Sequence, residues 1–375
     1  MIADLPAPSL RVLGIVVVAF AGLVLVLRRN RSTGVAAGTL RRGALSARVQ
    51  WRVLGLSGAV VTIGLGLVIV GLVVGDFPVP AGRALATALW DRGGEFDFVV
   101  NSLRFPRVVV AVLAGACLGV SGALFQSLVD NPLVSPDIIG INTGAAACAM
   151  TILLIGGHAG LLPVAAFVGA LATAAVIFLL SWRKGVSGAR LVLVGIGVNA
   201  LLAAVISFLL VRFPIEQVSA AATWQAGTLA AASWSNAAVL SAGLVVLFPL
   251  AFVLARRLRV LQLGDEVAGG LGLSVERCRV LVIVVGSGLA AVVVAVVGPL
   301  GFVALLVPHV ARSLTGALTG GVLVLTALLG AVMLLSADLI AQRLFAPTVL
   351  PAGIVTAAMG GPFLLAILRR YHRAF

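Results

Sequence analysis

A series of long apolar stretches, separated by short polar segments, constrains this chain more than any other feature. Hydrophobic residues make up 61% of its 375 residues and charged residues only 10%, whereas an ordinary soluble domain has about 25% charged residues. So few charges cannot cover the surface of a soluble protein. The composition therefore excludes a soluble enzyme, a disordered protein and a disulfide-rich scaffold, and it predicts an all-α polytopic membrane protein.

The apolar stretches from residue 53 onward predict about ten transmembrane helices, since one such helix needs about 20 apolar residues. These helices would form one membrane domain at residues 51–375, preceded by an N-terminal extension at residues 1–50. The extension holds a shorter apolar stretch at 12–27, which is either an extra membrane helix or an interfacial segment, and then an arginine-rich linker. The ten later stretches are 53–74, 106–128, 138–155, 161–181, 191–211, 236–255, 280–297, 301–315, 321–341 and 351–368.

Basic residues are distributed unevenly between the two sides of the predicted membrane domain. If the ten helices alternate in direction, one side holds seven arginines in residues 28–52, five in 256–279 and three in the tail 369–373. Because basic loops tend to stay in the cytoplasm, we expect these segments and the C-terminus to be cytoplasmic. Membrane orientation accounts in this way for the net charge of +14, so we expect no nucleic-acid binding.

Motifs that would indicate catalysis or a bound cofactor are missing from the sequence. It has no GxxxxGK[ST], so it does not hydrolyse ATP through a P-loop, and it has no GxSxG or HExxH. Its cysteines and histidines are too scattered for a metal site. We therefore expect no catalytic residue, no metal site and no cofactor. The scattered residues are Cys117, Cys148, Cys278, His158, His309 and His372.

Two further features are typical of a transporter that depends on an energising partner. Acidic residues are nearly absent from the predicted spans, with Asp338 the one acid deep in a span, and even this residue lies near the outer end. Since ion-coupled pumps usually need ionisable residues in mid-membrane, this scarcity argues against proton or sodium coupling. Prolines near 132–144 and 298–309 also predict discontinuous helices, which are common in transporters.

Two arginines in the stretch R-F-P-R at 104–107 are expected on the outer side, at the start of the second span. Guanidinium groups held there can pair with carboxylates of a soluble partner, or they can anchor to lipid phosphates. The residues alone leave both interpretations of Arg104 and Arg107 open.

The inner loop at residues 263–277 predicts a short amphipathic helix on the cytoplasmic face. Asp265 and Glu266 suit the start of a helix because of the helix dipole, and Gly272 can end it. Such a helix can dock a partner protein or lie on the bilayer. Its apolar face would consist of Val267, Ala268 and Leu271.

Several longer segments, taken together, resemble the FecCD family, the permease subunits of iron-siderophore and vitamin B12 ABC importers. The resemblance covers about residues 51–375. It rests on R-F-P-R at 104–107, SGALFQSLVDNPL at 121–133, the loop at 264–277, GPLGFVALLVPHVAR at 298–312, A-D at 337–338 and LPAGIVTA at 350–357.

The resemblance implies the vitamin B12 permease-like arrangement of ten transmembrane helices. Two permease subunits would form the pathway, two cytoplasmic ATPases would drive it, and an extracytoplasmic binding protein would deliver the substrate. Arg104 and Arg107 match the arginines that meet glutamates of the binding protein. The third docking arginine of the family aligns with Gln342 here, and Arg343, the next residue, is the candidate to replace it.

The resemblance also assigns two cytoplasmic regions. Residues 264–275 match the helices that couple the permease to the ATPase, and the loop at 187–190 matches the inner gate region. The coupling residues are Gly264, Asp265, Glu266, Val267, Ala268, Leu271 and Gly272, and the gate residues are Ser187, Gly188 and Ala189.

Within the family, SPDIIGINTGA at 135–145 and FQSL at 125–128 look most similar to ferric-enterobactin permease subunits, which work as one half of a heterodimer. The expected cargo is therefore a ferric siderophore of the catecholate type, carried across the cytoplasmic membrane of a bacterium. Cobalamin or haem transport by the same mechanism is the alternative. Outside this family, a lipid-modifying membrane enzyme would need clustered polar residues at one interface, and a secondary carrier would show uptake without ATP.

Overall fold

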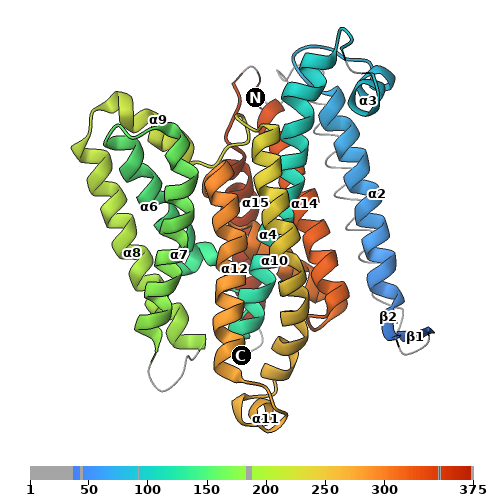
Figure 1. The fold of residues 1–375 in the computed structure, drawn as a ribbon, viewed down its shortest axis with the longest axis vertical. Helices are drawn as coiled ribbons and strands as arrows, with labels where there is room; N and C mark the ends of the chain where they lie inside the picture. The colour runs from blue at the N-terminus through green and yellow to red at the C-terminus, as the bar shows by residue number, and fades with distance from the viewer. Residues whose placement is uncertain are drawn as a thin grey trace.

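A computed structural model describes residues 37–42, 45–91, 93–182, 188–344, 346 and 348–372. Most of these residues are helical, and the long helices stand side by side between two ends of the molecule (Figure 1). We call the end that carries α3 (Ala81–Leu89) the α3 end, and the opposite end, which carries α11 (Asp265–Gly270), the α11 end. The last described helix, α15 (Ala352–His372), ends toward the α11 end.

Eight helical segments of the described residues are long and apolar enough to cross a membrane. Two shorter apolar helices, α6 (Ile141–Leu154) and α13 (Val303–Thr315), match the two remaining predicted stretches. The prediction of an all-α membrane protein is confirmed, and the number of about ten spans stays a prediction. The long segments are α2 (Trp51–Val73), η1 with α4 (Phe98–Val129), α7 (Leu162–Ser181), α8 (Gly188–Arg212), α10 (Trp234–Leu261), α12 (Val275–Val297), α14 (Gly320–Arg343) and α15 (Ala352–His372).

An antiparallel hairpin precedes the first of these helices. Its strands β1 (Ala37–Arg42) and β2 (Leu45–Gln50) pair Ala37 with Gln50, and α2 follows directly. The sequence had predicted an arginine-rich linker here, without a strand. The stretch 12–27, with its predicted extra helix, lies outside the described residues.

Helix α4 lies at the centre of the bundle and packs against α10, α12, α13 and α14. Its closest neighbour is α14, because glycines face each other across the contact. A Cβ atom added to Gly115 would lie 2.2 Å from the carbonyl oxygen of Gly330, and one added to Gly330 would lie 2.1 Å from that of Gly115. Small residues let backbones approach in this way where lipid offers no hydrophobic drive between helices.

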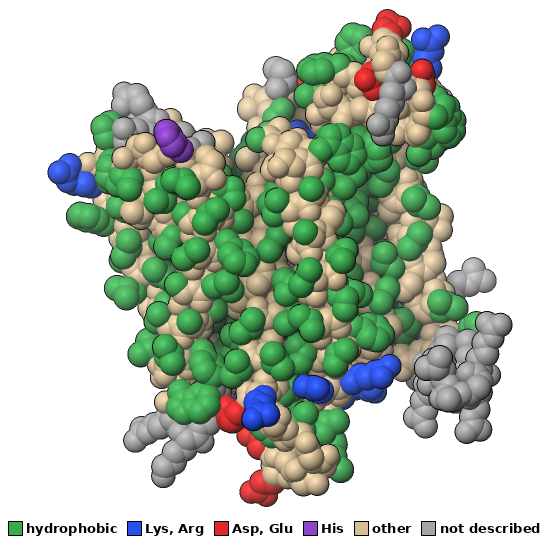
Figure 2. Space-filling model, in the orientation of Figure 1, with side chains coloured by type: hydrophobic (Ala, Val, Ile, Leu, Met, Phe, Trp, Pro, Cys, Tyr) green, Lys and Arg blue, Asp and Glu red, His purple; other side chains and the backbone are tan. Residues whose placement is uncertain are grey.

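Large apolar side chains cover the flank of the bundle, whereas charged side chains gather toward its two ends (Figure 2). The exposed apolar residues come from peripheral helices, with Leu65 on α2, Leu193 on α8 and Val246 on α10 as examples. This is the distribution expected of a surface that faces lipid or another membrane subunit.

Two chain segments break their helices inside the bundle, as the prolines predicted. One break precedes α6, where the single turn α5 (Pro136–Ile139) ends at Gly140 with φ +101°. The other lies between α12 and α13, where Gly298 has φ +79° and Phe302 has φ +67°. Helices α6 and α13 have 14 and 13 residues, so each is roughly 20 Å long, short of the ~30 Å hydrocarbon core. Both breaks therefore lie within the bundle and not at either of its ends.

Candidate functional site

A cavity of about 380 Å³ at the α3 end brings together the three arginines that the sequence singled out. It is lined by the end of α2, the π-helix η1 (Phe98–Arg104), α4 and the last turn of α14. Arg104, Arg107 and Arg343 all line it, although Arg343 is more than 230 residues away in sequence. We call it the α3-end cavity.

Arg107 is held by a carboxylate of the same chain. Its Nε donates to Asp338 Oδ2 and its Nη2 donates to Oδ1, both at 2.8 Å. The Asp338 side chain is 2% exposed and that of Arg107 is 17% exposed, so this pair is almost wholly buried. Gln342 Nε2 donates to the same Asp338 Oδ2 at 2.8 Å. The bidentate pair thus locks α4 to α14 at this end.

Arg104 binds the C-terminal end of α2. Its Nη1 donates to the carbonyl oxygens of Leu72 and Val73 at 2.9 Å each, and its Nη2 donates to that of Phe77 at 2.5 Å. The last carbonyls of a helix have no partner within the helix and carry the negative end of its dipole. Arg104 is therefore the C-terminal cap of α2, and it is only partly exposed.

Arg343 lines the same cavity, and its partner is an exposed carboxylate. Its Nη1 lies 2.7 Å from Asp76 Oδ1, and its Nε is buried with no partner among the residues that the structure describes. The Arg343 side chain is 11% exposed, whereas that of Asp76 is 91% exposed. Of the three arginines, Arg343 is thus the one whose partner carboxylate lies in solvent.

The short helix α11 protrudes from the opposite end of the bundle (Figure 1). It begins at Asp265, after Gly264 with φ +100°, and the chain turns back at Gly272 with φ +84°. Arg279 of α12 holds it through an ion pair with Asp265 at 2.9 Å. The two glycines therefore provide the left-handed backbone that the tight entry and exit of this helix require.

The apolar side chains of α11 divide between two faces. Ala268 is fully buried and joins the main core, so it does not belong to the outward face that the sequence assigned it to. Val267 and Leu271 are 51% and 66% exposed. The outward face is thus small and apolar, and the exposed carboxylates of Asp265 and Glu266 lie beside it.

The predicted gate residues lie at the start of α8. Gly188 begins the helix and packs against the end of α4, where a Cβ atom would lie 3.0 Å from the Cα of Val129. Ala189 follows on the same turn and is exposed. Ser187 lies outside the described residues.

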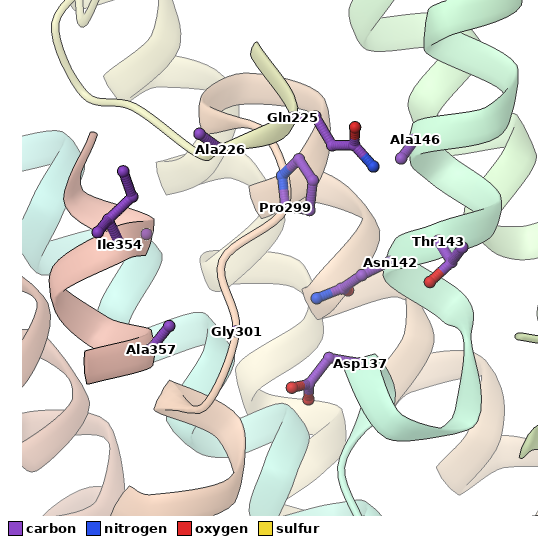
Figure 3. A pocket seen from close by; sticks show the side chains of 11 residues that line it. Asp137, Asn142, Thr143, Ala146, Gln225, Ala226, Pro299, Gly301, Ile354 and Ala357 are labelled. Atoms are coloured by element: carbon purple, nitrogen blue, oxygen red, sulfur yellow. The ribbon is translucent and has the colours of Figure 1, made fainter. Parts of the chain in front are cut away.

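A second cavity, of about 460 Å³, lies where the two helix breaks meet (Figure 3). It is lined by Asp137 and Asn142 beside the first break, by Gly301 in the second and by Ile354 of α15. Asp137 directly precedes the predicted span at 138–155, so the expectation that Asp338 is the one acid deep in a predicted span did not cover it. The structure places Asp137 inside the bundle as a second acid. We call this space the interior cavity.

The sequence analysis missed three residues that now stand out. Asp76 immediately follows the first span, and its position in an outer loop beside the arginines was the available signal. Asp137 and Asn142 belong to SPDIIGIN, which served only as a family motif. The described residues hold no group of three or more potential metal ligands, and the expected absence of a metal site stays a prediction.

Comparison with known proteins gives consistent matches over most of the chain. A family model described as the FecCD transport family matches residues 59–370. The ferric enterobactin transport system permease protein FepG of Escherichia coli K12 is 40% identical over 299 residues, covering 80% of this chain and 90% of that protein. The hemin transport system permease protein HmuU of Yersinia pestis is 38% identical and covers 72% and 82%. A solved structure of an inward-facing metal-chelate type ABC transporter matches with a TM-score of 0.74 at 26% identity, over 84% of this chain and 99% of that one.

Proposed function

The chain belongs to the FecCD transport family, and we propose that it is the permease subunit of an ABC importer that carries a ferric siderophore of the catecholate class into a bacterium. The identity of 40% to the ferric enterobactin permease of Escherichia coli supports this choice of cargo. The membrane domain would comprise residues 51–375, with residues 1–50 as an extension.

The observation that carries the proposal is the contrast between the two ends of the bundle. One end holds a recessed cavity with three arginines, and the other presents a protruding helix with an apolar face. A soluble protein that delivers cargo and a motor that supplies energy need two separate docking sites. The described helices connect these sites through the central pair α4 and α14.

Orientation follows from the basic residues at the α11 end. Arg256, Arg257 and Arg259 are exposed in the last turns of α10, and Arg277 is exposed at the start of α12. Because basic loops are retained in the cytoplasm, we place the α11 end and the C-terminus inside the cell. The α3-end cavity then faces the outside, where a binding protein arrives.

The energy would come from a separate ATPase dimer, because the sequence has no P-loop. We assign α11 with its flanking residues 264–272 to the contact with one ATPase subunit. Movement of α11 would be transmitted to α12 through the ion pair between Arg279 and Asp265, and rigid-body motion of the helices would alternate access to the pathway. Gly188 and Ala189 would line the inner gate.

The binding protein would dock through carboxylates at the α3-end cavity. Arg107 and Arg104 are held in place by Asp338 and by backbone carbonyls, so both side chains are fixed. Asp338 neutralises Arg107, whereas Arg104, bound to neutral carbonyl oxygens, supplies a fixed positive charge. Arg343 can exchange Asp76 for a carboxylate of the partner, since Asp76 lies in solvent. Arg343 would in this way take the role of the docking arginine that Gln342 replaces.

A second permease subunit would complete the pathway. Helix α8 exposes Leu193, Leu201 and Phe208, and α15 exposes Ile354, so both helices lack partners within the described residues over much of their surface. We propose that these helices face the second subunit across the path, with a heterodimer as the expected form.

Transport by the reconstituted complex tests the function. The permease, its second subunit and the ATPase are placed in vesicles with the binding protein outside, and uptake of ferric enterobactin, a ferric hydroxamate, haem and cobalamin is measured with and without ATP. ATP-dependent uptake of ferric enterobactin is the expected result. Uptake of haem alone would assign the function of the hemin permease relative instead, and uptake without the ATPase would contradict the mechanism.

A further inference from the structure

The interior cavity combines polar side chains with non-helical backbone, which an apolar lining of a transport pathway would not require. Its polar side chains include the carboxylate of Asp137 and the amides of Asn142 and Gln225, and they lie around the non-helical backbone of residues 298–302 (Figure 3). Non-helical backbone at membrane depth is tolerated where it is buried in protein or lines a water-filled space. The volume of about 460 Å³ is within the range of small-molecule sites.

Two acceptor oxygens on side chains that line this cavity have no partner among the described residues. Asn142 is 5% exposed, yet its Oδ1 accepts no hydrogen bond from the protein, and its Nδ2 makes only a long contact of 3.5 Å with the Leu300 carbonyl oxygen. Asp137 Oδ2 accepts from the backbone N–H of Phe302 at 3.3 Å, while its Oδ1 is buried without a partner. Buried polar atoms of this kind are rare in native proteins and point to a ligand or another function.

The walls of the cavity are fixed by short contacts between backbones. Gly353 at the start of α15 donates to the Gly227 carbonyl oxygen at 3.0 Å, and Thr228 donates to that of Val297 at 2.9 Å. A Cβ atom at Gly353 would lie 2.1 Å from the Ala226 carbonyl oxygen, so no larger residue fits there. The cavity is therefore a preformed space between α6, the second helix break and α15.

We propose that the interior cavity is a contact site for the transported chelate, with Asp137 and Asn142 accepting hydrogen bonds from hydroxyl or amide groups of the chelate backbone. This inference rests on the proposed function and adds specificity-determining residues to it. The unpartnered atoms are acceptors, so the ligand group must be a donor. A bound hard cation fits less well, because such ions need six or more oxygen ligands.

The charge of Asp137 also sets the orientation of the cargo. A carboxylate repels the anionic iron centre of a ferric catecholate and attracts its neutral, donor-bearing backbone. The iron centre would therefore point away from Asp137, toward the opening beside Ile354 and Ala357, which are both exposed.

Occupancy of the cavity can be measured by protection of a cysteine. In a Cys148→Ser background, which removes the exposed native thiol, Ala357→Cys places a thiol on the cavity lining and Ala358→Cys places one on the next, exposed residue outside the lining. The full complex in vesicles is treated with a maleimide, with and without saturating ferric enterobactin. We expect the chelate to slow labelling of Ala357→Cys and to leave Ala358→Cys unaffected.

The two acceptors are tested in the same complex. Asp137→Asn keeps an oxygen for the Phe302 N–H, so the helix break should be preserved, and Asn142→Ala removes the second acceptor. Each variant should weaken the protection of Ala357→Cys by the chelate. Each should also raise the KM for ferric enterobactin by about threefold to tenfold, which is the range for loss of one hydrogen bond. ATP hydrolysis stimulated by the binding protein reports that the variants still assemble. Asp130→Asn, outside the interior cavity at a left-handed position that asparagine tolerates, is the control and should match the unmodified protein.

The outcomes separate the inference from the function on which it rests. Equal labelling of Ala357→Cys with and without chelate, in a complex that imports ferric enterobactin, would overturn the contact site and leave the proposed function standing. A complex that imports no ferric siderophore would overturn the proposed function and the inference together. If Asp137→Asn fails to assemble, Asn142→Ala and the protection of Ala357→Cys still test the proposed contact site.

Discussion

The α3-end cavity and the outward face of α11, the two proposed docking sites, differ in their physical character. At the cavity, three guanidinium groups are recessed and already hold partners of their own chain, and of the two carboxylate partners only Asp76 lies in solvent. At α11, two apolar side chains protrude, and the nearest ion pair, between Arg279 and Asp265, supports the helix from behind. If both ends dock partners as proposed, the comparison teaches that the contact at the α3 end depends on charge and the contact at the α11 end on buried apolar area.

The largest effect should come from breaking the buried pair at the α3 end. Asp338→Ala leaves the Arg107 guanidinium buried without its counter-charge, which costs about 3–5 kcal/mol. Thermal unfolding of the purified permease in detergent measures this loss. Asp265→Ala, which removes the more exposed ion pair at the other end, is the matched control and should cost less than about 1 kcal/mol.

A double variant tests the reason for that loss. Replacing both Arg107 and Asp338 by apolar residues, as in Arg107→Met with Asp338→Leu, should recover most of the stability, because no charge is left unpaired. If the double variant is as unstable as Asp338→Ala, packing rather than charge accounts for the effect.

The second effect in size concerns the apolar face of α11. Val267→Ser with Leu271→Ser should weaken association with the ATPase by at least about tenfold, since burial of one such side chain contributes about 1.5–3 kcal/mol. Arg259→Gln removes an exposed charge from the same end and should leave the affinity unchanged. A larger effect from Arg259→Gln than from the serine variant would contradict an apolar contact.

A smaller effect is expected from Arg343. Arg343→Gln should lower the affinity for the binding protein by roughly fivefold, because an ion pair with a carboxylate that comes from solvent is worth about 1 kcal/mol. Binding measured by surface plasmon resonance on the vesicle-embedded complex would show the change mainly in the association rate. Unchanged affinity would remove Arg343 from the docking set.

The smallest expected effect is an increase in the affinity for the binding protein. Asp76→Asn removes the carboxylate that occupies Arg343, so the affinity for the binding protein should rise, by up to about fivefold. The same binding measurement checks it. A fall in affinity would mean that Asp76 itself meets a cation of the partner.

Most of the fold could be predicted from the sequence because each membrane helix is indicated by its own local stretch of residues. Each span needs only a run of apolar residues, and the helix breaks follow from prolines, glycines and the short lengths of α6 and α13. The same reasoning placed Arg104 and Arg107 on the outer side and began α11 at Asp265, where the structure begins it.

The partners of these residues could not be predicted in the same way. The contact between Arg107 and Asp338 joins residues 231 positions apart, and that between Arg343 and Asp76 joins residues 267 apart, so both depend on helix packing. The burial of Ala268 depends equally on how α11 rests on α10 and α12. The interior cavity needs three separate segments to meet, and no local pattern in SPDIIGIN indicates this.

The salt dependence of the two associations tests the contrast between the ends most directly. With one preparation of the complex components, binding of the permease to the binding protein and to the ATPase is measured between about 0.01 M and 1 M salt, over which the Debye length falls from ~30 Å to ~3 Å. We expect the affinity for the binding protein to fall steeply and that for the ATPase to stay constant or rise. A steep fall at the ATPase contact together with a flat response at the binding protein would contradict the account.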